Sequence, residues 1–198
     1  MNNIVIASKN KHKLEEIKEI LKDFPLAIKA MDEVGLEQLE IIEDGETFEE
    51  NAMKKAEEVM KKTGAISIAD DSGLEVEAIN NKPGIYSARF SGEGATDDKN
   101  NKKLLDMLKD IPVEKRKARF VSVISVVFPD GRKISVRGEC EGSIGFEEKG
   151  YNGFGYDPLF IVPKYNKTFA ELGPELKNKM SHRAKALEKL KEKLTYLL

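Results

Sequence analysis

Cysteine and histidine are scarce in this 198-residue sequence, which narrows the chemistry available to it. Cys140 is the only cysteine, so an intrachain disulfide and a cysteine-based zinc site are excluded. The two histidines, His12 and His182, are too far apart in sequence for a two-histidine metal motif at helical spacing. Cys140 is therefore expected to be a small buried core residue.

Long hydrophobic runs and an excess of charge of one sign are also missing. No apolar run reaches about 18 residues, so no membrane-spanning helix is expected. The N-terminal run is too short for a signal-peptide core, which predicts a cytoplasmic protein. The 33 Lys and Arg residues nearly balance the 35 Asp and Glu residues, giving a net charge of −2. This balance predicts no general attraction to nucleic acid or membranes.

Glycine-rich phosphate loops of the common kinds are absent too. Neither G-x-x-x-x-G-K-[ST] nor G-x-G-x-x-G occurs, so Walker and Rossmann nucleotide sites are excluded. The sequence contains no internal repeat, low-complexity segment or dividing linker. We therefore expect one domain spanning residues 1–198.

The most informative stretch is residues 66–79, in which an apolar run leads into Asp70 and Asp71, a Ser-Gly pair and a second alternating run. The β-branched residues predict a strand that stops at the acids, with a turn at Ser72. Open α/β sheets place ligands at such strand ends, and carboxylate oxygens suit Mg²⁺. Neighbouring side chains of a strand face opposite ways, so at most one of the two acids should point into a site. A polar turn capped by Asp is the alternative.

A basic turn follows the first expected strand, residues 4–7, and precedes a helix that runs to about residue 22. Backbone N–H groups at a helix N-terminus bind anions. Cations there oppose the helix dipole, a conflict that a bound phosphate would remove. An exposed basic turn without a ligand is the alternative. The candidate phosphate-binding residues are Ser8, Lys9, Asn10, Lys11, His12 and Lys13.

Helix and strand signals continue along the chain. Thr47 and Glu50 predict a capping box for a helix that stops at Gly64, and Thr96 is the expected cap of another helix. Strands are expected at residues 26–30, 118–128, 133–140 and 160–162. The acidic segment 32–46 is expected to be a loop whose acids are mostly solvated, with one completing a metal site beside Asp70 and Asp71.

Two later segments have the composition of ligand contacts. Residues 150–160 interleave glycines with aromatic residues, which allows a flat ligand to approach the backbone and stack on a ring; a glycine-rich hairpin loop is the alternative. Ser181 is the expected cap of a closing helix, and His182 and Arg183 place cations in its first turn. This favours a ligand contact over a merely basic helix surface.

Together these features describe a site for a nucleoside triphosphate, its Mg²⁺ and its base. Six motifs resemble those of the inosine triphosphate pyrophosphatase family, which hydrolyses non-standard purine nucleotides, and the resemblance runs from Ile4 to about Leu190. The motifs are Ser8-x-Asn10-x-x-Lys13, Thr47-Phe48-x-Glu50-Asn51-Ala52, Ala69-Asp70-Asp71-Ser72-Gly73-Leu74, Pro83-Gly84-x-Tyr86-Ser87-Ala88-Arg89, Gly153-Phe154-Gly155-Tyr156-Asp157-Pro158 and Ser181-His182-Arg183.

The resemblance implies an α/β fold: an elongated mixed β-sheet flanked by helices, with two lobes and a central substrate cleft, assembled as a homodimer. It implies Mg²⁺-dependent hydrolysis of ITP, dITP and XTP to the monophosphate and pyrophosphate. Asp71 matches the general base and also a metal ligand, Glu43 is the second metal ligand, and Asp70 is a less favoured one. The implied substrate-binding residues are Ser8 to Lys13, Ser72, Phe154, Gly155, Tyr156, Asp157, Lys177, His182 and Arg183.

Base selectivity has a chemical rationale, and two other functions stay open. Inosine and xanthine carry an acceptor at position 6 where adenine has a donor, so Lys177 or Arg183 facing that oxygen would disfavour ATP. GTP shares this oxygen, so its rejection requires exclusion of its 2-amino group. One alternative is a pyrophosphatase for other bases, such as modified pyrimidines, with a smaller base pocket. The other is a non-catalytic nucleotide sensor, which the intact acids disfavour.

Overall fold

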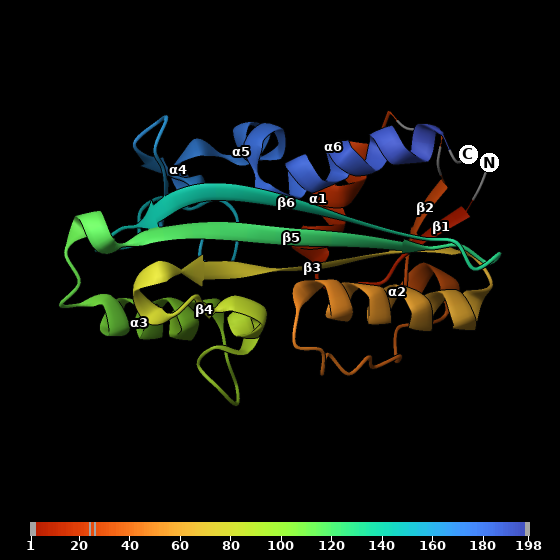
Figure 1. Ribbon diagram of the computed structural model, residues 1–198, viewed down its shortest axis with the longest axis horizontal. Coiled ribbons are helices and arrows are strands. Elements are labelled where there is room, and N and C mark those ends of the chain that lie inside the picture. Colours follow the sequence, from red (N-terminus) through yellow and green to blue (C-terminus); the bar gives the residue numbers. More distant parts are fainter. Residues whose placement is uncertain (1–2, 24, 26, 197–198) are drawn as a thin grey trace. The chain divides into compact units, whose positions relative to one another are not determined.

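The computed structural model describes residues 3–23, 25 and 27–196 and has a mixed α/β fold, as expected (Figure 1). The chain divides into two compact units. The first unit comprises Met1–Asp71, Ser122–Gly138 and Arg183–Leu198, and the second comprises Ser72–Val121 and Glu139–His182. Each unit therefore combines segments that are distant in sequence.

Three long strands contribute residues to both units: β3 (Ile66–Val76), β5 (Lys117–Val127) and β6 (Lys133–Ile144). The first unit also contains β1 (Asn3–Ile6), α1 (Lys11–Leu21), β2 (Ala27–Ala30), a 3₁₀ helix (Asp32–Val34), α2 (Phe48–Thr63) and α6 (His182–Thr195) apart from its first residue. The second unit also contains 3₁₀ helices Glu77–Ile79, Gly84–Arg89 and Val113–Lys115, strands β4 (Lys82–Pro83), β7 (Phe160–Val162) and β8 (Lys167–Thr168), and helices α3 (Asp97–Leu108), α4 (Phe169–Leu172) and α5 (Pro174–Met180).

The strands of the first unit follow the order β2-β1-β3-β5-β6. β1 runs parallel to both of its neighbours, so that Ile4 lies opposite Ile28 of β2 and Ile66 of β3. In the second unit, β4 pairs antiparallel with β3, and β7 pairs antiparallel with both β6 and β8. The sheet is thus mixed, with its parallel pairs at the N-terminal strands.

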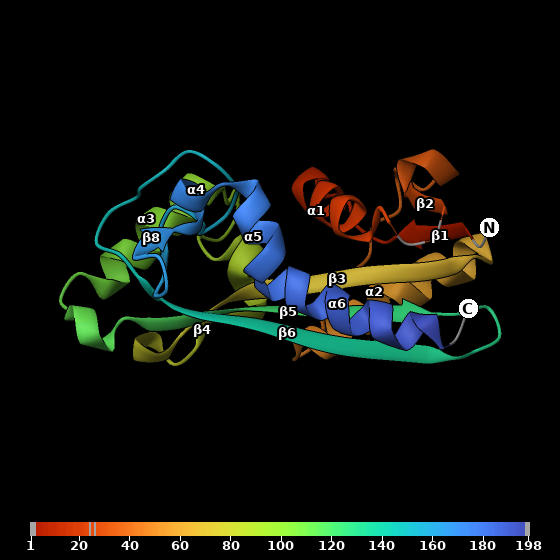
Figure 2. The same ribbon diagram turned by 90° about the horizontal axis from the view of Figure 1, so that it is seen from above.

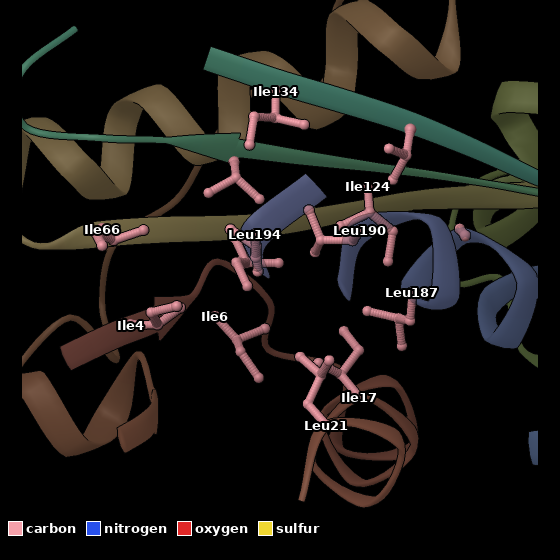
Figure 3. Packing of buried hydrophobic residues seen from close by; sticks show 14 of the residues in the cluster. Ile4, Ile6, Ile17, Leu21, Ile66, Ile124, Ile134, Leu187, Leu190 and Leu194 are labelled. Atoms are coloured by element: carbon pink, nitrogen blue, oxygen red, sulfur yellow. The ribbon is translucent and has the colours of Figure 1, made fainter. Parts of the chain in front are cut away.

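Helices of the first unit cover the two faces of its strands. Figure 1 shows α2 on one side of β3 and α6 on the other, and Figure 2 shows α6 lying along β6. Leu187, Leu190 and Leu194 of α6 pack with isoleucines of the strands and with α1, as Figure 3 shows. On the α2 face, Ala56 and Val59 pack with a separate set of strand side chains. The second unit has its own core, which includes the buried Cys140.

The positions of the helix ends agree with the cap signals in the sequence, but the predicted capping box of Thr47 and Glu50 is only half formed. Thr47 Oγ1 accepts the Glu50 N–H at 3.1 Å, and Gly64 ends α2 in the left-handed conformation. The Glu50 carboxylate, however, accepts the N–H of Glu46 instead of the N–H of Thr47. Thr96 caps α3 as predicted, and α6 begins directly after Ser181.

The prediction that the strand at residue 66 stops at the acids, with a turn at Ser72, was wrong. β3 continues through Ser72 and Gly73 to Val76, because pairing with neighbouring strands outweighs the local turn preference. β6 extends to Ile144, and β8 and α4 had no sequence signal that we used. Residue 26, the expected start of β2, lies outside the described residues.

Candidate active site

The alternation of β3 separates its two aspartates. Ile66 and Ile68 belong to the core cluster of α1 and α6, while Ala69 belongs to the cluster of α2. With a period of two, Asp70 faces the α1 and α6 side and Asp71 faces the α2 side. Both carboxylates are nearly inaccessible, with residue exposures of 1% and 5%. The expectation that the two acids face opposite ways is confirmed.

Asp70 is the centre of a buried network of cations. Its carboxylate accepts from Arg183 Nε and Nη2 at 3.2 Å each, from Lys13 Nζ at 2.7 Å and from Ser122 Oγ at 2.6 Å. Arg183 also pairs with Glu16 of α1. Burial would raise the pKa of Asp70, but Arg183 and Lys13 outweigh it and hold that pKa well below its usual range. Asp70 therefore stays ionised and ties α1, β3, β5 and α6 together.

Asp71 has the opposite electrostatic environment. Its Oδ1 accepts from Lys55 Nζ at 2.8 Å, and the same ammonium donates to Glu43 Oε1 at 3.2 Å. Burial raises the pKa of Asp71 to about 6, and Glu43 contributes to the rise although Lys55 opposes it. Asp71 Oδ2 is buried and has no hydrogen-bond partner within the described parts of the chain. Asp71 is thus a carboxylate poised to accept a proton near neutral pH.

Sequence reasoning missed Lys55, Glu16 and Ser122 as members of these networks. Lys55 lies three residues after Ala52 on the buried face of α2, and its residue exposure is only 7%. A lysine on the apolar stripe of an amphipathic helix was the available signal, because such a charge needs a buried partner. Burial would lower the pKa of Lys55, but Asp71 and Glu43 raise it above its ordinary value.

The basic turn is only partly directed at solvent. Asn10 caps α1 by accepting the Lys13 N–H, and Ser8 Oγ accepts the Asn10 N–H. The Lys13 ammonium points inward to Asp70, and burial lowers the pKa of Lys13. Lys9, Lys11 and His12 are exposed. Among the predicted phosphate-binding residues, Lys9, Lys11 and His12 are therefore exposed, while the Lys13 side chain faces inward.

In the second unit, the glycine-aromatic segment surrounds a buried ion pair. Lys177 Nζ donates to Asp157 Oδ2 at 2.6 Å, and the same oxygen accepts the Phe154 N–H at 3.0 Å. The ammonium also lies 4.5 Å from the centre of the Phe154 ring. Residues 154, 157 and 177, which are predicted site residues from two distant segments, are thus in contact, and Lys177 is only 3% exposed.

The remaining predicted residues of this unit are fixed by other contacts. The Tyr156 hydroxyl donates to the Ser87 carbonyl at 2.7 Å. The His182 imidazole stacks on the Phe120 ring, with 4.7 Å between the ring centres. Ser72 is half-buried on β3 directly after Asp71. The base-binding roles of these residues stay predictions.

Glu43 and Asp71 have the chemistry of a Mg²⁺ site. Both offer carboxylate oxygens beside one ammonium, and the buried Oδ2 of Asp71 is an acceptor without a hydrogen-bond partner among the residues that the structure describes. No group of three or more metal-ligating side chains occurs in the described ranges. Two carboxylates suffice, because Mg²⁺ in phosphate-transfer sites commonly takes one or two carboxylates and completes its shell with substrate phosphates and water.

None of the helices that the structure describes is both long and apolar enough to cross a membrane.

The model of the Ham1 family matches residues 4–193. The chain belongs to the Ham1 family. A family relative, the dITP/XTP pyrophosphatase of Clostridium perfringens (strain 13 / Type A), is 50% identical over 204 residues that cover 100% of both proteins. The Ham1 protein of Staphylococcus aureus matches with a TM-score of 0.89 and 43% identity, covering 100% of both chains. The HAM1 protein of Coxiella burnetii matches with a TM-score of 0.90 and 41% identity, covering 99% of this chain and 100% of its own.

Membership in the Ham1 family confirms the resemblance that the six sequence motifs predicted. The likeness to Ham1 structures at more than 40% identity confirms the mixed α/β fold with flanking helices. The central substrate cleft and the homodimer stay predictions. The contacts described above show how the residues of these motifs interact in this chain.

Proposed function

We propose that this chain is a nucleoside triphosphate pyrophosphatase that hydrolyses ITP, dITP and XTP to the monophosphate and pyrophosphate with Mg²⁺ as cofactor. The observation that carries the proposal is the cluster of Asp71, Glu43 and Lys55, in which one buried carboxylate has a raised pKa and a partnerless oxygen. The 50%-identical relative named dITP/XTP pyrophosphatase supports the choice of substrates.

Asp71 is the proposed general base. A carboxylate with a pKa of about 6 is mostly ionised at neutral pH yet is basic enough to take a proton from water. The water oxygen forms the new bond to the α-phosphorus, and the bond from that phosphorus to the bridging oxygen breaks, so that pyrophosphate leaves. Lys55 holds the Asp71 carboxylate in place through Oδ1.

Glu43 and Asp71 are the proposed metal ligands. When bound, Mg²⁺ supplies positive charge that offsets the charge of the phosphates. The exposed side chains of Lys9, Lys11 and His12, with Ser8 and Asn10 of the same turn, are the proposed triphosphate contacts. Lys13 is assigned the same role from its buried position on Asp70.

Lys177 and Asp157 are proposed to recognise the base. A buried ammonium paired with a carboxylate is nearly neutral as a unit, so it suits the neutral 6-oxygen of the base better than a phosphate. Phe154, beside the Lys177 ammonium, offers a ring for stacking. Gly155, Tyr156, Ser72, His182 and Arg183 complete the proposed substrate-binding set. Arg183 donates to Asp70 through Nε and Nη2 and to Glu16 through Nη1, so we expect it to combine substrate binding with support of Asp70.

We also propose that the chain acts in the cytoplasm as a homodimer, with residues 1–198 forming one functional domain. The close balance of charge supports an assignment without nucleic acid or membrane partners. The resemblance to the inosine triphosphate pyrophosphatase family supports the homodimer.

Product analysis tests the function directly. The protein would be incubated with Mg²⁺ and each of ITP, XTP, GTP, ATP and dUTP, and pyrophosphate and orthophosphate would be measured separately. We expect pyrophosphate from ITP and XTP and little from ATP and GTP. Orthophosphate release would mean attack at the terminal phosphate and would overturn the mechanism. Pyrophosphate mainly from dUTP would favour a pyrimidine enzyme, and tight ITP binding without product would favour a sensor.

A further inference from the structure

We propose that Asp97 and Asn101 of α3 are specificity-determining positioning residues that set the base loop, defined here as residues 153–157. Both act through the backbone of Gly155 and do not touch the substrate themselves. The inference rests on the proposed function, because it assumes that this loop recognises the base.

Gly155 is held by helix α3 at both of its backbone polar groups. The Gly155 N–H donates to Asp97 Oδ2 at 2.7 Å, and the Gly155 carbonyl accepts from Asn101 Nδ2 at 3.1 Å. Positions four apart on a helix lie on one face, one turn above the other. The first turns of α3 therefore present an acceptor and a donor that match the two backbone groups of one peptide residue.

These hydrogen bonds matter because Gly155 has no side chain that could fix its conformation by packing. Its φ of +61° lies in the left-handed region, and a Cβ built on it would have no neighbour within 4 Å. Glycine visits this conformation readily and just as readily leaves it. Because residue 155 has no side chain and the space where a Cβ would lie is open, we expect its conformation to depend on the hydrogen bonds to Asp97 and Asn101.

Asn101 also connects the base loop to the chain that leads into it. Its Nδ2 donates to Glu148 Oε1 at 2.8 Å as well as to the Gly155 carbonyl. Both partners are acceptors, so the amide nitrogen must face them and the orientation of the amide is fixed. Asn101 is only 2% exposed, and it bridges residues 148 and 155 through two partly buried hydrogen bonds.

The next side chain of the loop is anchored near the same helix. The Tyr156 hydroxyl donates to the Ser87 carbonyl, which also accepts from Asn100 Nδ2 at 3.3 Å. Burial raises the pKa of Tyr156 further above its ordinary value, with Asp97 contributing, so the phenol remains a donor. Residue 155 is thus bonded directly to Asp97 and Asn101, and residue 156 shares the Ser87 carbonyl with Asn100, so the contacts come from little more than one turn at the start of α3.

The consequence concerns Phe154 and Asp157, which flank the anchored residues. The Phe154 N–H and the Lys177 ammonium both donate to Asp157 Oδ2. A rotation of the peptide at Gly155 would change the separation of Phe154 from Asp157 and would disturb the donor offered to the 6-oxygen of the base. Loss of the α3 contacts should therefore weaken recognition of the base. It should spare the phosphate chemistry, because Asp71, Glu43 and Lys55 make their contacts within the other unit.

Alanine substitution of two neighbouring acids tests the proposal. Asp97 and Asp98 are both exposed and lie in the first turn of α3, so each replacement removes the same charge from the same helix end. Of these two acids, Asp97 is the one that accepts the Gly155 N–H. For Asp97→Ala we expect the KM for ITP to rise about tenfold, equivalent to about 1.4 kcal/mol, with kcat within about twofold of the parent. Asp98→Ala should match the parent, and Asp97→Asn, which keeps an oxygen acceptor, should recover most of the loss.

Two further measurements separate positioning from general damage. Inhibition by inorganic tripolyphosphate, which has no base, should be unchanged in Asp97→Ala, and thermal unfolding would verify that the variant is folded. Asn101→Asp, which sets a carboxylate against two acceptors, should reduce the preference for ITP over GTP. Equal KM values for Asp97→Ala and Asp98→Ala, or a matching loss of tripolyphosphate affinity, would overturn the proposal.

Failure of the proposed function would be recognised separately. If the parent protein released no pyrophosphate from ITP, the function would be wrong, and the variants would be compared by calorimetric titration with IMP. Weaker IMP binding in Asp97→Ala than in Asp98→Ala would still support the positioning role. Equal binding, or no binding by the parent protein, would overturn it.

Discussion

Replacing each of the adjacent acids of β3 with asparagine should have different consequences: Asp70→Asn should mainly lower stability, and Asp71→Asn should mainly abolish activity. Asp70 receives two bonds from Arg183, one from Lys13 and one from Ser122. The Arg183 side chain is 1% exposed and the Lys13 side chain 15% exposed. In Asp70→Asn these cations lose the charge that compensates their burial. Removing one partner of a buried ion pair costs about 3–5 kcal/mol, and we expect a loss of this size in the free energy of unfolding.

Asp71→Asn should lower the free energy of unfolding far less than Asp70→Asn. The rise of the Asp71 pKa from 3.8 to about 6 means that the fold disfavours the ionised carboxylate by about 3 kcal/mol. Lys55 would keep its bonds to Glu43 Oε1 at 3.2 Å and to the Asp70 carbonyl at 2.9 Å. We therefore expect the free energy of unfolding of Asp71→Asn to stay within about 1 kcal/mol of the parent.

Urea unfolding at pH 7, with the parent protein as reference, measures both changes. In parallel, Asp71→Asn should lose nearly all turnover of ITP while retaining most of its ITP binding, because it keeps its shape but cannot take the proton from water. Equal destabilisation by the two substitutions would refute the assignment of opposite electrostatic roles. Unchanged turnover in Asp71→Asn would remove Asp71 from its role as general base.

Three further predictions concern packing and the cofactor. Arg116 donates to three backbone carbonyls and is 1% exposed. Arg116→Met should therefore lower the free energy of unfolding, measured by urea titration, by about 3 kcal/mol or more. A loss below about 1 kcal/mol would contradict this prediction. Gly150→Ala should lower the melting temperature much more than Gly155→Ala: both have positive φ, but only a Cβ at position 150 collides with the backbone of Ala170 and Glu171. Similar melting temperatures would contradict the difference. Removal of Mg²⁺ with EDTA should abolish pyrophosphate release from ITP, and added Mg²⁺ should restore it; persistent activity would contradict a metal role for Glu43 and Asp71.

The helix boundaries could be predicted from the sequence because caps are local. Thr47 and Glu50 are three residues apart, and Gly64 follows the last helical residue, so the signals lie within single turns of chain. The family could likewise be predicted, since six short motifs keep their order and spacing along the chain. The opposite directions of Asp70 and Asp71 needed only the period of a strand.

The continuity of β3 could not be predicted, because Ser72 and Gly73 carry a local turn signal that only pairing with other strands overrides. Likewise, the six motifs show that Asp70 and Asp71 are neighbours in sequence, but they do not indicate that the pKa of Asp70 is lowered while the pKa of Asp71 is raised.

Tertiary structure decided the roles of these charges. Lys55 is 16 residues from Asp71, and Arg183 is 113 residues from Asp70, yet folding brings each pair into contact. The pKa of a buried carboxylate depends on its distance from such charges and on its loss of water, neither of which is encoded in neighbouring residues. The sequence by itself therefore determined which acids and bases this protein carries, while the packing of α1, α2 and α6 on the strands decided which acid is held ionised by cations and which has a raised pKa.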